Sequence, residues 1–171
     1  MKTLTVLLAL AVVSPVSLSA AAGDTSRQAE VREKGKDVMP FSVEATTHVF
    51  TKTTDGGVQR VVARDMNDAA TVKLVRAHLH EIQHRFGNGD FGAPSDIHGQ
   101  DMPGLAELRS AKPGQVRIAY RDVKAGAELA FKTSDPALVT ALHRWFDAQL
   151  SDHGRDAIEG HQHDHGSMQA M

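Results

Sequence analysis

The chain has 171 residues, of which 41% are hydrophobic, 23% charged and 5% aromatic, with a formal net charge of −2. This length and apolar fraction predict one domain with its own core. The near balance of 19 basic and 21 acidic residues leaves no broad basic footprint for nucleic acid. The absence of cysteine excludes disulfides, thiolate metal sites and cysteine nucleophiles. Ten histidines make imidazole the most distinctive chemistry of the chain.

Residues 1–22 have the layout of a secretory signal peptide. Lys2 precedes an apolar run from Leu4 to Val13, and small residues lead to an expected cleavage site after Ala21 or Ala22. The alternative, a membrane anchor, is less favoured because the run ends before Pro15 and is shorter than the ~20 apolar residues of a membrane span. We therefore expect a periplasmic or secreted protein without stable membrane insertion after cleavage.

The composition divides the remaining chain into three parts. Residues 23–40 are polar and lack a firm apolar period, so they are predicted to form a flexible lead-in. Residues 41–154 carry regular patterns and form the predicted domain. Residues 155–171 form a predicted disordered tail rich in histidine and methionine.

The first half of the domain predicts a strand–strand–helix unit. A Thr- and Val-rich strand at 45–53, a glycine turn at 55–57 and a returning strand at 58–64 are followed by a helix. Asn67 or Asp68 can cap this helix, whose apolar residues recur at spacings of three and four up to about Phe86.

The same order recurs in the second half. Alternating strands at 115–122 and 127–131 precede a helix that Pro136 opens and that Ser134 or Asp135 can cap. Two ββα units predict an α+β fold, with a four-stranded antiparallel sheet and two helices on one face. The glycine-rich stretch 87–104 between them is irregular and long enough to suggest a function, and a short helix can follow it at residues 105–110.

Several histidines lie on the predicted helices. His80 and His84 share one side of the first helix, and imidazoles at this spacing can bind one metal ion, although two solvated polar residues give the same pattern. His78 lies on the other flank of the apolar stripe and cannot join them. His143 is expected to pack in the core, and His153 suits a helix C-terminus, where the helix dipole favours it.

Two more candidate ligands lie outside the helices. His48 is on the first strand, where it either binds a ligand or is simply packed or solvated. His98 lies in the glycine-rich stretch near Asp96, Asp101 and Met102, and this mixture of imidazole, oxygen and thioether groups suits copper better than magnesium. In the alternative interpretation, the two acids cap turns and Met102 fills a hydrophobic gap.

The tail gives a sharper signal. His161, His163 and His165 alternate with other polar residues, and Met168 follows them. Short histidine-rich tracts bind divalent transition metals, and histidine together with methionine is expected for copper in an oxidising compartment. A disordered polar tail with incidental metal affinity is the alternative.

Seven segments resemble a family of small exported bacterial proteins that often carry the label aspartate carbamoyltransferase. The segments are EATTHVFTKT (44–53), DGGVQ (55–59), IHG (97–99), DMPGL (101–105), DPALV (135–139), LHRWFDAQ (142–149) and DHG (152–154). The resemblance covers residues 40–154. Residues that match the family pattern are His48, His98, Met102, His143 and His153, whereas His80, His84 and the tail match it less clearly.

The activity in that label is not expected of this chain. Carbamoyltransferases resemble two-domain α/β enzymes that bind carbamoyl phosphate through a Ser-Thr-Arg-Thr loop and a His-Pro-x-Gln motif, and neither string occurs here. No glycine-rich phosphate loop of the Walker or dinucleotide type occurs either. His98 with Asp101 is the closest acid–base pair, but no catalytic residue or organic cofactor is assigned.

The sequence favours a transition-metal-binding protein for sequestration or delivery, with copper as the first choice and zinc or nickel as alternatives. A small enzyme or ligand-binding domain that uses His98 and Asp101 is the second hypothesis. A third is a module that binds a protein through the open sheet face, near Arg117, Arg121 and Lys132. The predicted metal ligands are His48, His80, His84, His98, Met102, His161, His163 and His165.

Overall fold

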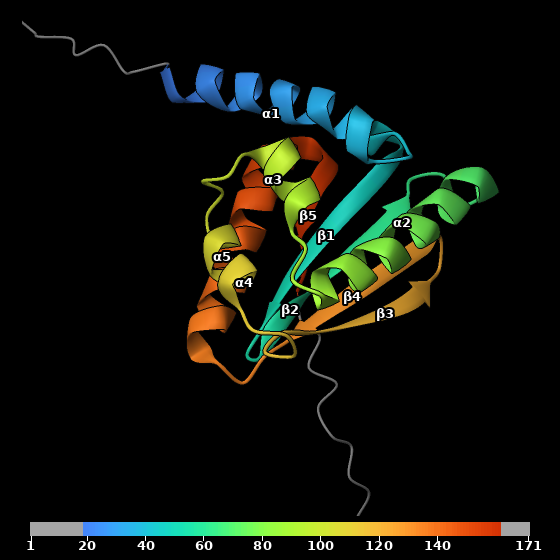
Figure 1. Cartoon of the computed structure of the whole chain (residues 1–171). Helices are drawn as coiled ribbons and strands as arrows, with labels where there is room; N and C mark the ends of the chain where they lie inside the picture. Colours follow the sequence, from blue (N-terminus) through green and yellow to red (C-terminus); the bar gives the residue numbers. More distant parts are fainter. Residues whose placement is uncertain (1–18, 162–171) are drawn as a thin grey trace, which may run out of the picture.

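The computed structural model describes residues 19–161, which form an α+β fold with five α-helices and one mixed five-stranded sheet (Figure 1). The helices are α1 (Ser19–Val38), α2 (Ala69–Gly87), α3 (Gly92–His98), α4 (Leu105–Ser110) and α5 (Pro136–His153). The strands are β1 (Thr46–Thr53), β2 (Gly56–Ala63), β3 (Arg117–Val123), β4 (Gly126–Lys132) and β5 (Ala157–Glu159). Single 3₁₀ turns, Val43–Ala45 and Gly154–Asp156, precede β1 and β5.

The sheet has the strand order β3-β4-β2-β1-β5. The first four strands pair antiparallel, whereas β5 runs parallel to β1, with Ala157 opposite His48. The prediction of a four-stranded antiparallel sheet is therefore wrong in detail. Three residues are too few to carry a recognisable strand pattern, and the partner of β5 lies at the other end of the domain.

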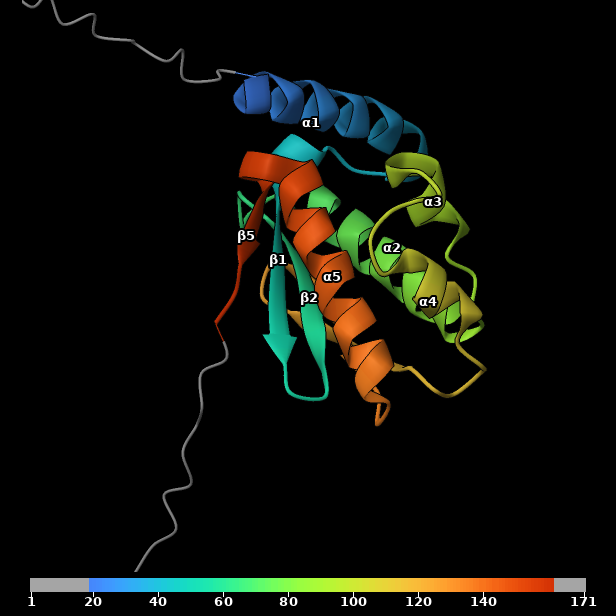
Figure 2. The ribbon, with the colours of Figure 1, turned by 90° about the vertical axis from the view of Figure 1, so that its left-hand side faces the viewer.

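Helices α2 and α5 pack against one face of the sheet, as Figure 2 shows. Asp68 and Asp135 cap them, each side chain accepting a hydrogen bond from a backbone N–H of the first turn, so both predicted helix starts are confirmed. The predicted short helix is confirmed as α4, but α3 lies within the stretch predicted to be irregular. The core between helices and sheet includes Phe50, Leu79, Phe86, Leu129, Phe131, Leu142, Trp145 and Phe146.

Helix α1 replaces much of the predicted flexible lead-in. It lies across one end of the molecule, over the C-terminal end of α5 (Figure 2). Val31 is fully buried there, and Arg27 and Arg32 pair with Asp152 and Asp156 at 2.9 and 3.0 Å. The prediction was wrong because the contacts that hold this polar helix reach residues 125 and 124 positions away.

The predicted tail also begins later than expected. Residues 155–161 continue through the 3₁₀ turn and β5, and Gly160 donates a backbone hydrogen bond to the carbonyl oxygen of Phe50. Residues 162–171 and 1–18 lie outside the described residues, so the predicted signal peptide and most of the tail stay predictions. Between residues 19 and 161, none of the helices has the length and apolar character of a membrane span.

Candidate functional site: a buried histidine cluster

Three histidines from three separate elements meet in the interior. His48 comes from the middle of β1, His98 is the last residue of α3, and His153 is the last residue of α5. The rings of His48 and His153 stack with centroids 4.9 Å apart, and the ring of His98 stands edge-on to His153 at 5.3 Å. All three are buried, with exposed fractions of 4%, 6% and 7%. We call these residues the histidine cluster.

Local geometry brings the three rings together. Alternation along β1 puts His48 on the buried face with Thr46 and Phe50. Gly154 follows His153 with a φ of +52°, which glycine adopts readily, and turns the chain out of α5. The chain then enters β5, whose pairing with β1 sets Ala157 opposite His48. The turn and the strand together fix the end of α5 beside β1.

Asp152 orients His98. Its carboxylate lies 2.7 Å from Nδ1 of His98 and accepts two hydrogen bonds from the Arg27 guanidinium, at 2.9 and 3.1 Å. Burial raises the pKa of the Asp152 carboxyl, but the hydrogen bonds from His98 and Arg27 outweigh it and lower that pKa to about 2. An ionised carboxylate accepts only, so it favours the His98 tautomer with the proton on Nδ1. Nε2 of His98 then keeps a free lone pair.

The other two imidazoles are neutral near pH 7. Burial, reinforced by the nearby His78, lowers the pKa of His48 to about 4, and burial lowers the pKa of His153 well below its ordinary value of 6.5. Among the described residues, neither ring nitrogen of His48 has a hydrogen-bond partner. Such buried, unpartnered nitrogens cost about 1–3 kcal/mol each, which a bound ligand can recover.

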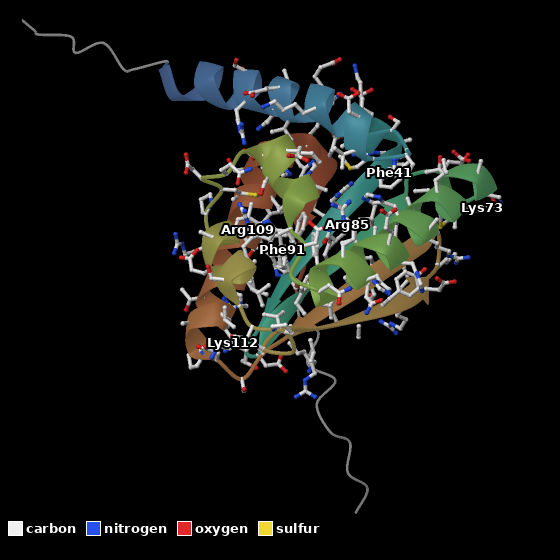
Figure 3. The ribbon with its side chains drawn as sticks, viewed as in Figure 1. Phe41, Lys73, Arg85, Phe91, Arg109 and Lys112 are labelled. Carbon is white, nitrogen blue, oxygen red and sulfur yellow. The ribbon has the colours of Figure 1, made fainter. Side chains whose placement is uncertain are left out.

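The histidine cluster borders a cavity of about 60 Å³, a volume on the order of two water molecules. His78 also lines this cavity, and burial lowers its pKa. Phe41, whose ring lies 5.6 Å from that of His78, sits below the end of α1 (Figure 3). Most of its other lining side chains are apolar, among them Val61, Leu79, Ile82, Phe86, Ile97 and Trp145, and the amides of Gln59 and Gln149 also line it. The site therefore joins buried imidazole nitrogens to a mainly apolar cavity.

The predicted ligands do not form one site. His48 and His98 come together, with His153 between them, but His80 and His84 are exposed on α2. The ring of His80 packs edge-on against Tyr120 at 5.3 Å, and Nδ1 of His84 lies 3.2 Å from the side-chain nitrogen of Asn88. The helical spacing that suggested the pair is correct, but it places both rings in solvent rather than at the cavity.

The remaining predicted residues lie elsewhere. Met102 is buried beside the outer groove that His98 also borders, and not at the cavity. The carboxyl partner of His98 is Asp152 and not the exposed Asp101. His161 is exposed at the end of the described chain, whereas His163 and His165 lie outside the described residues.

His143 is a structural residue, in agreement with the prediction that it packs. Its Nε2 lies 3.0 and 2.9 Å from the carbonyl oxygens of Thr53 and Gly56 and fixes the β1–β2 turn. The residues that sequence reasoning missed are His153, Asp152 and Arg27. No local spacing in the sequence connects these three residues, because their partners lie far away along the chain.

Within residues 19–161, no group of three or more histidine, aspartate or glutamate side chains has the geometry of a formed metal site. The stack of His48 and His153 is consistent with this, since an ion between two nearly parallel rings cannot meet the in-plane lone pairs of both. The cluster thus has the ligand types of a metal site but not its final orientation.

No protein-family model, curated protein or solved structure matches the chain. The chemistry of the histidine cluster is therefore the basis for assigning a function.

Proposed function

We propose that this is an exported protein that binds a transition metal, copper in the first place and zinc or nickel as alternatives, for sequestration or delivery. The observation that carries the proposal is the convergence of three buried imidazoles on one cavity. Metal ligation needs unprotonated imidazole, and the lowered pKa values of His48 and His153 keep these rings unprotonated.

The spacing of the rings supports ligation. With metal–nitrogen bonds of ~2.1 Å and an angle between tetrahedral and trigonal, adjacent imidazole centroids lie roughly 5.3 to 5.6 Å apart. The observed separations of 4.9 and 5.3 Å are close to this range. A rotation of His48 or His153 out of their stack is the change that ligation requires.

The surroundings of His98 support the same proposal. Metal-binding histidines commonly donate their second ring N–H to a carboxylate, which fixes the tautomer and makes the free nitrogen more basic. Asp152 occupies this position 2.7 Å from Nδ1 of His98, and Arg27 holds the carboxylate in place.

In this proposal the tail captures ions and passes them to the cluster. The described chain ends at His161, directly after Gly160, which bonds to Phe50 two residues beyond His48 on β1. The tail therefore leaves the domain at the sheet edge next to the strand that carries His48. His163 and His165 extend this donor set, and the signal-peptide pattern of residues 1–22 supports function outside the cytoplasm.

A second candidate is a small enzyme or ligand-binding domain, favoured by the His98–Asp152 pair beside an apolar cavity. With the proton on Nδ1, Nε2 of His98 could accept a proton from a small neutral ligand. This arrangement replaces the predicted His98–Asp101 pair. The labelled carbamoyltransferase activity is not part of the proposal, because its phosphate-binding motifs are missing from the sequence.

Calorimetric titration with copper separates the two candidates. The protein is the full chain, exported and processed by its host, with the tail histidines replaced by His161→Ala, His163→Ala and His165→Ala. We expect one ion to bind with micromolar affinity or better. If this variant stays folded and binds no metal at micromolar concentrations, an ordered metal site in the domain is excluded.

A further inference from the structure

We propose that the histidine cluster selects monovalent copper over divalent metal ions, an inference that rests on the proposed function. It is carried by the charges around the cluster, by the apolar cavity and by the small number of ligands that can converge.

The carboxylates beside the cluster are already neutralised by arginine. Arg27 pairs with Asp152, while Arg32 and Arg64 both pair with Asp156, each at 3.0 Å. Arg27 and Arg32 also lie 3.7 Å from the half-exposed Glu30 and Glu44, so the network carries no large excess of either sign. The Asp156 carboxylate is almost fully buried and Asp152 nearly so. Because both are already bound to arginine, neither is free to neutralise a dication.

These charged groups lie close to the imidazoles. Arg32, Asp152, His153 and Asp156 line one small hollow beneath α1, and Asp152 bonds to His98. The charges of Asp156 and Arg64 act on His48 with opposite signs. A metal at the cluster therefore experiences this ion-pair network at short range, where screening by solvent is weak.

Desolvation acts in the same direction. The electrostatic cost of moving an ion from water into a medium of low dielectric constant grows with the square of its charge, so it is about four times larger for a divalent ion. The cavity walls are mostly aliphatic and aromatic, and the three imidazoles contribute no negative charge. Divalent ions in proteins usually recover this cost through carboxylates, thiolates or retained water.

The number of ligands also fits a monovalent ion. Zinc in structural sites takes four protein ligands, whereas residues 19–161 contain no ready group of three. Monovalent copper is stable with two or three neutral nitrogen ligands. A modest rotation that aims His48 or His153 at the free nitrogen of His98 is therefore sufficient. The exposed His161, by contrast, begins a water-accessible tract that suits divalent ions.

The test compares ions of different charge on the same protein. The full chain carrying the three tail substitutions is titrated anaerobically with monovalent copper against a bicinchoninate competitor, with silver(I) as a redox-inert monovalent probe, and with zinc by calorimetry. We expect silver and monovalent copper to bind one ion per chain, and zinc to bind on the order of 100-fold more weakly. Binding of zinc as tight as that of monovalent copper overturns the selectivity and leaves the proposed function standing. If neither the monovalent ions nor zinc bind, both the selectivity and the proposed function are overturned.

A charge variant tests the cause. Arg64→Gln removes one positive charge beside Asp156 without touching an imidazole, and Arg64 is 45% exposed, so the fold should tolerate the change. We expect zinc binding to strengthen about 5- to 10-fold, and silver binding to strengthen less, because the repulsion is twice as large for a dication. The matched control is Arg60→Gln. Arg60 lies on β2, four residues before Arg64, and pairs with Glu128 instead. Equal changes for both ions, or equal effects of both variants, contradict the proposal.

Discussion

Two groups of histidines within the described residues differ both in their spacing along the sequence and in their surroundings. His80 and His84 lie one helical turn apart, exposed, in contact with Tyr120 and Asn88. The histidine cluster instead gathers one residue from each of β1, α3 and α5, and buries all three beside a cavity. Regular spacing placed two imidazoles on one helix face, whereas tertiary contacts placed three in a buried site. A group of histidines is therefore better suited to bind a ligand when its members are buried and close together than when they are only regularly spaced.

The largest expected effect on stability comes from removing the carboxylate behind the cluster. Asp152→Asn removes the charged acceptor of both the Arg27 guanidinium and His98, and leaves Arg27 with the His98 carbonyl oxygen and the exposed Glu30. We expect a loss of about 2 kcal/mol in the free energy of unfolding, measured by urea denaturation.

The matched control is Asp90→Asn, which breaks the exposed Asp90–Arg85 pair beside His84. There we expect a change of about 0.5 kcal/mol or less. Equal losses in the two variants would show that the ion pairs behind the cluster are no different from surface pairs.

A second prediction uses the lowered pKa of His48. The folded protein binds a proton at His48 only near pH 4, whereas the unfolded chain binds it near pH 6.5. Stability is therefore complete above pH 6.5 and decreases as the pH falls from 6.5 towards 4, because protons favour the unfolded state there. We expect a loss of about 1–2 kcal/mol between pH 6.5 and pH 5, and His153 contributes in the same direction.

The variant His48→Leu should flatten this pH dependence. Since the nitrogens of His48 have no partner within the described residues, an apolar side chain of similar size should cost little at pH 7. His84→Ala is the control on the exposed pair. An unchanged pH profile in His48→Leu would mean that His48 is not the buried neutral group described above.

A smaller effect concerns the helix that covers the cluster. Arg27→Gln combined with Arg32→Gln removes the ion pairs that hold α1, leaving Val31 as its main buried contact. We expect amide hydrogens of residues 25–38 to exchange about 5- to 10-fold faster, corresponding to about 1 kcal/mol of local stability. Arg85→Gln on α2 should leave this segment unchanged. If α1 stays equally protected in the double variant, its docking does not depend on the arginines.

Much of the framework could be predicted from local patterns. The hairpin turns, the two long helices and their caps are each specified by contiguous residues, such as Asp68 before α2 and Asp135–Pro136 at the start of α5. These features need no knowledge of distant partners. Local sequence therefore predicted the α+β class, but it left open whether His48 on the first strand is packed, solvated or bound to a ligand.

The cluster could not be predicted in this way. It depends on β5, which is three residues long, on a positive φ at Gly154 and on a helix whose polar surface gave no apolar period. His153 was explained by the helix dipole because its neighbours in space, His48 and His98, are far away along the chain.

The comparison of the two histidine groups is tested most directly by metal affinity in paired variants. In the full chain with the tail histidines substituted, His48→Leu with His153→Leu should weaken the binding of silver(I) on the order of 100-fold or more, since about two ligand bonds are lost. His80→Ala with His84→Ala should leave it unchanged within about twofold. Retained binding in the first double variant, or its loss in the second, would contradict the assignment of the buried cluster as the metal site.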